Sequence, residues 1–295
     1  MSRATVDPGT SLGVEIVLDS DDETPVDFID FTLRGTQRVV LGAGRGQQMR
    51  DLIVLSLARR ERPRVLPRGE KSFRVRFDIP ERMPPAYRGF SATVLYELGV
   101  HVSIPWWPDR RSSFDIRVAV PPAPPRPIPT VLTFGSSAKG AAAEGVYIET
   151  SLDRVELAPG GVLQGAASFS NVATSRVRSI EVAFILTEHM LAPWVSAVPA
   201  KKYSLTLVKG APAEGQPIPF KIRLPPDAPP GFTAALFRLA WHLEIRAVVL
   251  FGDDIVLRIP IEVVPATIGE VAAKTRVAPV GRERRALVWA GVAER

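Results

Sequence analysis

The sequence predicts an all-β protein that consists of two tandem antiparallel β-sandwiches. Apolar and polar residues alternate in short runs, as at Phe73, Val75 and Phe77 and again at Tyr203 and Leu205, and this period of two buries one face of a strand. The 28 prolines and 22 glycines interrupt these runs at short spacing, which is typical of sandwiches and not of folds that alternate strands with helices. The chain of 295 residues suits two domains of about 130 residues each.

Apolar runs with the length and composition of strands fill both halves of the chain. In the first half they cover residues 13–18, 27–33, 52–58, 72–79, 90–104 and 114–120. In the second half they cover residues 146–151, 162–170, 179–187, 203–208, 219–224, 235–250 and 255–264. Long helical patterns are absent from the sequence of both halves, so the layers of each domain are expected to be sheets.

The order of motifs occurs twice. A Pro-Gly turn at Pro8 returns at Pro159, 151 residues later, and precedes an apolar strand both times. The run VRFDIPERMPPAY at residues 75–87 is answered by FKIRLPPDAPPGF at residues 220–232, 145 residues later. Two copies in the same order predict two domains of one fold, by internal duplication.

These patterns set the domain boundaries. We predict an N-terminal sandwich over residues 1–122, a Pro/Gly/Ala-rich linker over 123–145, a C-terminal sandwich over 146–265 and a tail over 266–295. The stretch PPAPPRPIP at residues 121–129 predicts a stiff polyproline-type spacer.

Two polar stretches are expected to be connections without chemistry of their own. Residues 41–51 contain GAGRGQQ, in which Gln47 stands where a dinucleotide-binding fingerprint would have its third glycine, so we expect a mobile loop. Residues 19–23, DSDDE, have the oxygen density of a calcium site but not the spacing of an EF-hand. We expect a solvated hairpin turn there.

The sequence offers no catalytic, cofactor-binding or metal-ligating residues. Cysteine is absent, which excludes disulfides, thiolate metal sites and cysteine nucleophiles. The three histidines, His101, His189 and His242, lack the spacing of metal ligands. His242 and Glu244 share a strand face, but a base and its orienting acid without a nucleophile form a weak signal.

The chain is basic overall, with a formal net charge of +6 and a sequence pI of about 9.9. Arginines gather between residues 45 and 76, where they serve either to solvate strand edges or to face an acidic or phosphorylated partner or an acidic membrane surface. Nucleic acid is not expected, because no aromatic residues are interleaved with them. The candidate partner-binding arginines are Arg45, Arg50, Arg59, Arg60, Arg62 and Arg64.

Trp106 and Trp107 begin the motif WWPDRR, in a turn between two predicted strands. We expect one of them to cap the core of the sandwich. In the alternative, the pair is an exposed aromatic anchor of the type that dominates binding hot spots.

Taken together, the Pro-Gly turn, the strand ending in Ile/Leu-Pro and the Pro-Pro-x-Tyr/Phe motif before a long aromatic strand resemble an arrestin-type domain. Because this order is present twice between about Val6 and Pro265, the chain is similar to bacterial arrestin-like proteins of the sporulation-control branch. The resemblance implies immunoglobulin-like sandwiches and a non-catalytic binding role. It also implies a tail that folds back on the N-terminal domain, with Leu287 and Trp289 as latch candidates. The alternative is a tail that is disordered, contacts a neighbouring chain or leads into a further region.

The function expected from these features is that of a non-catalytic adaptor or regulatory scaffold that binds a protein partner. The alternative is a β-sandwich ligand- or carbohydrate-binding module, or an enzyme with an unrecognised site. The N-terminus MSRATVDPGTSLG lacks the pattern of a secretory signal, and no apolar stretch of about 18 residues is present. We therefore expect a cytoplasmic location.

Overall fold

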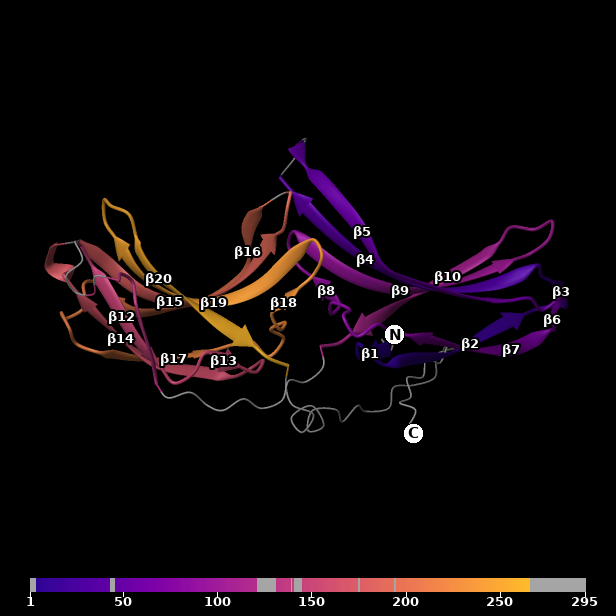
Figure 1. Ribbon diagram of the computed structural model, residues 1–295, viewed down its shortest axis with the longest axis horizontal. Coiled ribbons are helices and arrows are strands. Elements are labelled where there is room, and N and C mark those ends of the chain that lie inside the picture. Colours follow the sequence, from indigo (N-terminus) through magenta and orange to yellow (C-terminus); the bar gives the residue numbers. More distant parts are fainter. Residues whose placement is uncertain are drawn as a thin grey trace. The chain divides into compact units, whose positions relative to one another are not determined.

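The computed structural model describes residues 4–42, 46–120, 131–138, 140, 145–174, 176–193 and 195–265. The chain separates into two compact units, of which the first contains the residues up to 121 and the second contains most of those that follow. Both units are built almost entirely of β-strands, as the ribbon in Figure 1 shows. The prediction of an all-β chain with sandwich-like packing of sheets is confirmed. In the described part of the chain, no helix has the length and apolar character that crossing a bilayer requires.

The first unit consists of a large sheet and a small one. The large sheet has six strands in the order β1-β10-β9-β4-β5, with β8 beside β9, and only β1 runs parallel to its neighbour. Strands β2 and β7 form the facing layer (Figure 1), and the short strands β3 and β6 pair at one end. Apolar side chains from both layers, such as Phe31 of β4 and Phe77 of β7, are fully buried between them. The bounds are β1 Ala4–Val6, β2 Ser11–Ser20, β3 Thr24–Pro25, β4 Phe28–Leu41, β5 Gln48–Glu61, β6 Val65–Leu66, β7 Gly69–Asp78, β8 Tyr87–Arg88, β9 Ala92–Ser103 and β10 Arg110–Val118.

The second unit has the same large sheet and a wider small one. Its six-stranded sheet has the order β13-β20-β19-β15-β16, with β18 beside β19, and its four-stranded sheet has the order β11-β12-β14-β17. Phe184 of β15 and Phe169 of β14 are fully buried in the core between these sheets. The bounds are β11 Leu132–Gly135, β12 Tyr147–Leu152, β13 Glu156–Leu157, β14 Val162–Ser170, the 3-10 turn Val172–Thr174, β15 Val177–Met190, β16 Ser196–Lys209, β17 Ile218–Arg223, β18 Phe232–Thr233, β19 Phe237–Val249 and β20 Ile255–Val263.

Equivalent positions of the two units make equivalent hydrogen bonds. The Tyr96 hydroxyl donates to the carbonyl oxygen of Pro84 at 2.6 Å, and the Trp241 indole Nε1 donates to that of Pro229 at 2.8 Å. Both members of the second pair lie 145 residues after those of the first. The spacing seen in the sequence is therefore also a spacing between matching side-chain contacts.

The hairpins that follow the first long strand differ in length. In the first unit, Gly35 of β4 pairs with Leu55 of β5, 20 residues later. In the second unit, the corresponding Leu186 of β15 pairs with Lys201 of β16, only 15 residues later. In the first unit β9 pairs with β4 as far as Val39, so the end of the β4–β5 hairpin is a two-stranded ribbon beyond the sheet.

The structure corrects three expected connections. The predicted loop at residues 41–51 is shorter, because β4 continues to Leu41 and β5 begins at Gln48. The acidic stretch 19–23 is not the turn of a hairpin, since β2 pairs with β7 and β3 pairs with β6. Its backbone is instead held by Ser20, whose hydroxyl donates to the carbonyl oxygen of Asp22 at 2.8 Å.

Part of the predicted linker is also a strand. Within residues 123–145, β11 pairs with β12 and extends the small sheet of the second unit. Residues 121–130, 139 and 141–144 lie outside the described residues. The sheet of the second unit therefore begins before residue 146, where the sequence had placed its first strand.

Candidate functional site

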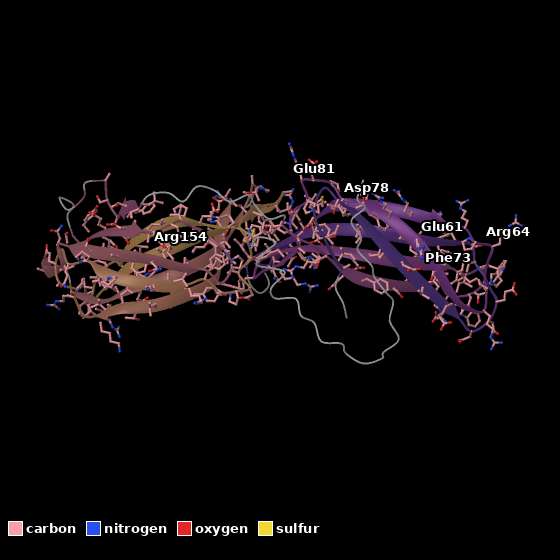
Figure 2. All side chains as sticks on the ribbon, turned by 90° about the horizontal axis from the view of Figure 1, so that it is seen from below. Glu61, Arg64, Phe73, Asp78, Glu81 and Arg154 are labelled. Carbon is pink, nitrogen blue, oxygen red and sulfur yellow. The ribbon has the colours of Figure 1, made fainter. Side chains whose placement is uncertain are left out.

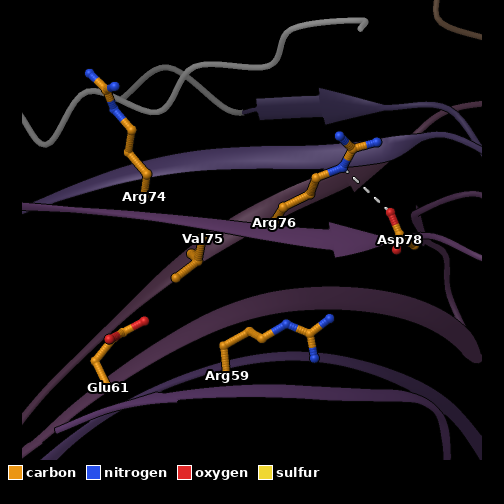
Figure 3. A pocket seen from close by; sticks show the side chains of 6 residues that line it. All are labelled: Arg59, Glu61, Arg74, Val75, Arg76 and Asp78. Carbon is orange, nitrogen blue, oxygen red and sulfur yellow. Dashed lines mark ion pairs between the residues drawn. The ribbon is translucent and has the colours of Figure 1, made fainter.

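A groove runs along the open side of the first unit, between the edge strand β5 and the strand β7. It has a volume of about 280 Å³. Arg59 lies on the inward face of β5, because it pairs with the buried Phe31 of β4. Val75 of β7 is buried, so its neighbours Arg74 and Arg76 point outward. The groove is lined by Arg59, Glu61, Arg74, Val75, Arg76 and Asp78 (Figure 3).

One end of the groove is held by a polar cluster around Asp78. The Ser11 hydroxyl donates to Asp78 Oδ1 at 2.6 Å, and Arg76 Nη2 donates to the Ser11 oxygen at 2.7 Å. The Arg76 Nε lies 3.6 Å from Asp78 Oδ1, the ion pair drawn in Figure 3. The hydrogen bond from Ser11 and the charges of Arg76 and Arg59 lower the pKa of Asp78, which is therefore ionised at neutral pH.

The arginines of the groove differ in how far their charge is neutralised. Arg74 Nη2 is 3.4 Å from Glu15 Oε1, but its side chain is 84% exposed, so water screens this pair. Arg59 Nη1 donates to the Ala58 carbonyl oxygen at 3.2 Å, and no acidic side chain of the described residues pairs with it. Arg59 is thus the groove cation without an acidic partner among the described residues, and Arg74 has only the screened pair with Glu15.

Arg60 lies on the opposite face of β5 and is bound by the protein itself. Its Nε and Nη2 donate to the two carboxylate oxygens of Asp30, each at 2.6 Å. The guanidinium also lies 4.1 Å above the Phe28 ring centroid. The hydrogen bond from Arg60 lowers the pKa of Asp30. The structure therefore separates Arg60 from the groove with which the sequence had grouped it.

The remaining candidate arginines are spread over the first unit. Arg50 is exposed on β5, and Arg62 and Arg64 are exposed between β5 and β6. Figure 2 shows Arg64 at one end of the unit, beyond Glu61. Arg45 lies outside the described residues, as do the tail positions Leu287 and Trp289, so the latch stays a prediction.

The expectation that Trp106 or Trp107 caps the core is wrong. The Trp106 side chain is fully exposed and that of Trp107 is 65% exposed. Both lie at the tip of the hairpin between β9 and β10, because Trp107 N donates to the Ile104 carbonyl oxygen at 3.3 Å and closes a tight turn. The alternative, an exposed aromatic pair, is the arrangement that the structure has.

Glu244, which shares the outer face of β19 with His242, is part of an ion network with Arg246 and Arg258. The Glu244 side chain is only 2% exposed, and its two oxygens accept hydrogen bonds from Arg246 at 2.7 Å and from Arg258 at 3.1 Å. Burial would raise the pKa of Glu244, but these hydrogen bonds outweigh it and lower the pKa. Burial lowers the pKa of His242. Glu244 is thus engaged by arginines and does not orient an imidazole.

In the ranges that the structure covers, no three His, Asp or Glu side chains are placed to hold a metal ion. The groove offers guanidinium donors, which bind carboxylates and phosphates in a bidentate manner. The lining also includes the carboxylates of Glu61 and Asp78, so the groove carries charges of both signs.

Sequence reasoning missed one pair of polar contacts. His101 Nε2 lies 2.7 Å from Asp109 Oδ2 next to the tryptophan turn, and Arg246 Nη1 lies 3.1 Å from Asp254 Oδ2 next to the equivalent turn of the second unit. Both partners are displaced by 145 residues, so the repeat spacing could have found them. No protein-family model matches the chain, and no curated protein matches it in sequence.

Proposed function

We propose that the chain is a non-catalytic cytoplasmic adaptor, and that the groove of its first unit binds an acidic or phosphorylated segment of a partner protein. The observation that carries the proposal is the position of Arg59 and Arg74 on the two strands that border the groove. Their guanidinium groups are charged at every physiological pH and form strong hydrogen bonds with carboxylates and phosphates.

The open edge of β5 supports the same proposal. β5 is the last strand of the large sheet and is 14 residues long. A long edge strand exposes backbone donors and acceptors that an extended segment of another protein can pair with. The equivalent edge strand β16 contains Pro199, which cannot donate a backbone hydrogen bond to an added strand. β5 has no proline.

Further support comes from the correspondence of the two units. The large sheets share one strand order, and Tyr96 and Trp241 make equivalent hydrogen bonds. These features favour an internal duplication of one immunoglobulin-like domain, with the arrangement that the sequence resemblance to arrestin-like proteins implies. By analogy between folds, a binding role fits such a scaffold.

The proposal is tested by binding of an acidic phosphopeptide, measured by fluorescence anisotropy at several salt concentrations. Replacing Arg59, Arg74 and Arg76 by serine is expected to weaken binding by about tenfold or more, since charge-assisted hydrogen bonds are lost. The variant should also show a weaker dependence on salt, because fewer charges are screened.

The matched control is Arg60→Ser, on the same strand but on its other face. This variant loses the ion pair with Asp30 and leaves the groove intact, so we expect peptide affinity to stay within about twofold, as for an ordinary surface change. Equal losses in the two variants, or binding that salt does not affect, would show that the groove is not the site.

A further inference from the structure

The tip of the β9–β10 hairpin holds a tryptophan in an unfavourable backbone conformation. Pro105 and Trp106 are the central residues of the turn closed by Ile104 and Trp107, and Trp106 has a φ of 64°. This is the left-handed region, which glycine occupies at this position of a type II turn and bulky side chains rarely adopt. The turn therefore has tryptophan at a position where glycine would adopt the backbone conformation with less strain. The indole at this position is fully exposed.

Contacts at the base of the hairpin fix the direction of the tip. Asp109 Oδ1 accepts a hydrogen bond from the Ile104 backbone N–H at 3.4 Å, and Oδ2 lies 2.7 Å from His101 Nε2. The His101 ring meets the edge of Phe28 with 5.5 Å between centroids. Arg60 covers the same Phe28 ring at 4.1 Å. These contacts thus hold the base of the hairpin below the exposed tip in a defined conformation.

The same turn exists in the second unit with different surroundings. Phe251 has a φ of 63° and is 93% exposed, and Asp254 Oδ1 accepts from the Val249 backbone N–H at 3.1 Å. All three positions follow those of the first hairpin by 145 residues. Asp253, two residues after Phe251, is an exposed acidic residue.

The charges beside the first tip have the opposite sign. Arg110 and Arg111 begin β10 directly after Asp109, both are exposed, and neither pairs with an acid of the described residues. Tryptophan prefers the interface between water and lipid, where its apolar ring and its N–H are both satisfied. Basic residues next to it are attracted to anionic headgroups.

We propose that the tip from Trp106 to Arg111 is an anchor that inserts into the interface of an anionic lipid bilayer. The shape of the tip favours this occupant, since a convex turn offers two indole rings but no concave surface that could enclose a peptide. The hairpin belongs to the large sheet and projects away from β2 and β7 (Figure 1). The acidic connection at residues 19–23 joins β2, a strand of the facing layer, to the short strand β3.

The test is sedimentation of the full chain with vesicles of phosphatidylcholine, with and without phosphatidylserine, together with quenching of tryptophan fluorescence by brominated lipid. The wild type is expected to bind only the vesicles with phosphatidylserine and to be quenched. The Arg110→Ser/Arg111→Ser variant should bind roughly 25-fold less, since each basic residue at an anionic surface contributes a factor of about five (about 1 kcal/mol).

The variant Trp106→Gly/Trp107→Ser separates binding from folding. Glycine accepts the left-handed conformation without strain, so the melting temperature is expected to stay within about 2 °C of that of the wild type while vesicle binding is lost. The matched control is Phe251→Gly in the equivalent turn, which should bind vesicles as the wild type does.

Three results would overturn the proposal: no binding of the wild type to anionic vesicles, unchanged binding of the tryptophan variant, or an equal loss in the Phe251 variant. The proposal does not depend on the groove. Vesicle binding should therefore persist when Arg59, Arg74 and Arg76 are replaced by serine.

Discussion

Replacing the buried carboxylate of the second unit tests how much its ion network contributes to stability. Glu244→Gln keeps the shape of the side chain but leaves Arg246 and Arg258 facing a neutral amide. Breaking a buried ion pair costs about 3–5 kcal/mol when the remaining charge is sealed from water. Here Arg246 is 30% exposed and Arg258 is 63% exposed, so water compensates part of the loss.

We therefore expect the free energy of unfolding to fall by about 2 kcal/mol, which for a unit of this size lowers the melting temperature by about 8 °C. The assay is differential scanning calorimetry between pH 3 and pH 7. Because the pKa of Glu244 is lowered by folding, its contribution is fully present above the ordinary glutamate value of 4.5 and disappears as the pH falls through the lowered value. The difference between wild type and Glu244→Gln should shrink over that window.

The control for this experiment is Glu97→Gln, at an exposed position of β9, where the change should stay within about 0.5 kcal/mol. Equal melting temperatures of Glu244→Gln and the wild type at pH 7 would refute the reasoning. So would a difference that stays constant down to pH 3, since the carboxylate would then not be the source of the effect.

Two further predictions concern the paired aromatic contacts. Gly35→Ala should destabilise the first unit by about 1–3 kcal/mol, because the new Cβ would lie 2.7 Å from Cε1 of Tyr96; urea unfolding measures this, and a neutral result would mean that the ring moves aside freely. Tyr96→Phe should cost about 1 kcal/mol by removing the hydrogen bond to Pro84, and Trp241→Phe should cost more, because it loses the bond to Pro229 and also leaves a cavity; a smaller cost for Trp241→Phe, measured in the same way, would contradict this ranking.

Much of the fold followed from the period of two and from the repeated motifs. Phe73 is half-buried and Val75 and Phe77 are buried, as their alternation predicts. The alternation at Tyr203 and Leu205 was less informative, and Leu205 is 43% exposed. The reason is that β16 is an edge strand of its sheet, and whether a strand lies at an edge depends on pairing between distant segments, which the local pattern does not contain.

The candidate site was predicted only in part. Adjacent residues of a strand point to opposite faces, so the sequence alone is enough to assign Arg59 and Arg60 to different surfaces. The sequence does not predict that Arg59 lines the same groove as Arg74 and Arg76. These residues belong to strands of two different sheets, and the packing of one sheet edge against the other is not encoded in the local pattern. For Trp106 the sequence offered both a core cap and an exposed anchor, and the local pattern did not decide between them, because tryptophan seldom adopts the positive φ that this turn has.

The unequal hairpins show where this scaffold accommodates changes in chain length. The sequence spacing between the two copies falls from 151 residues near the start to 145 farther on, and five of the missing residues are accounted for by the shorter interval between Leu186 and Lys201 than between Gly35 and Leu55. Both large sheets nevertheless keep the same strand order. Residues added at the end of a two-stranded ribbon disturb no core contact and close only a slightly longer loop. The length of the β4–β5 hairpin can therefore change without a change in the sandwich. The end of this hairpin is a suitable position at which to insert a reporter or to graft a new recognition loop.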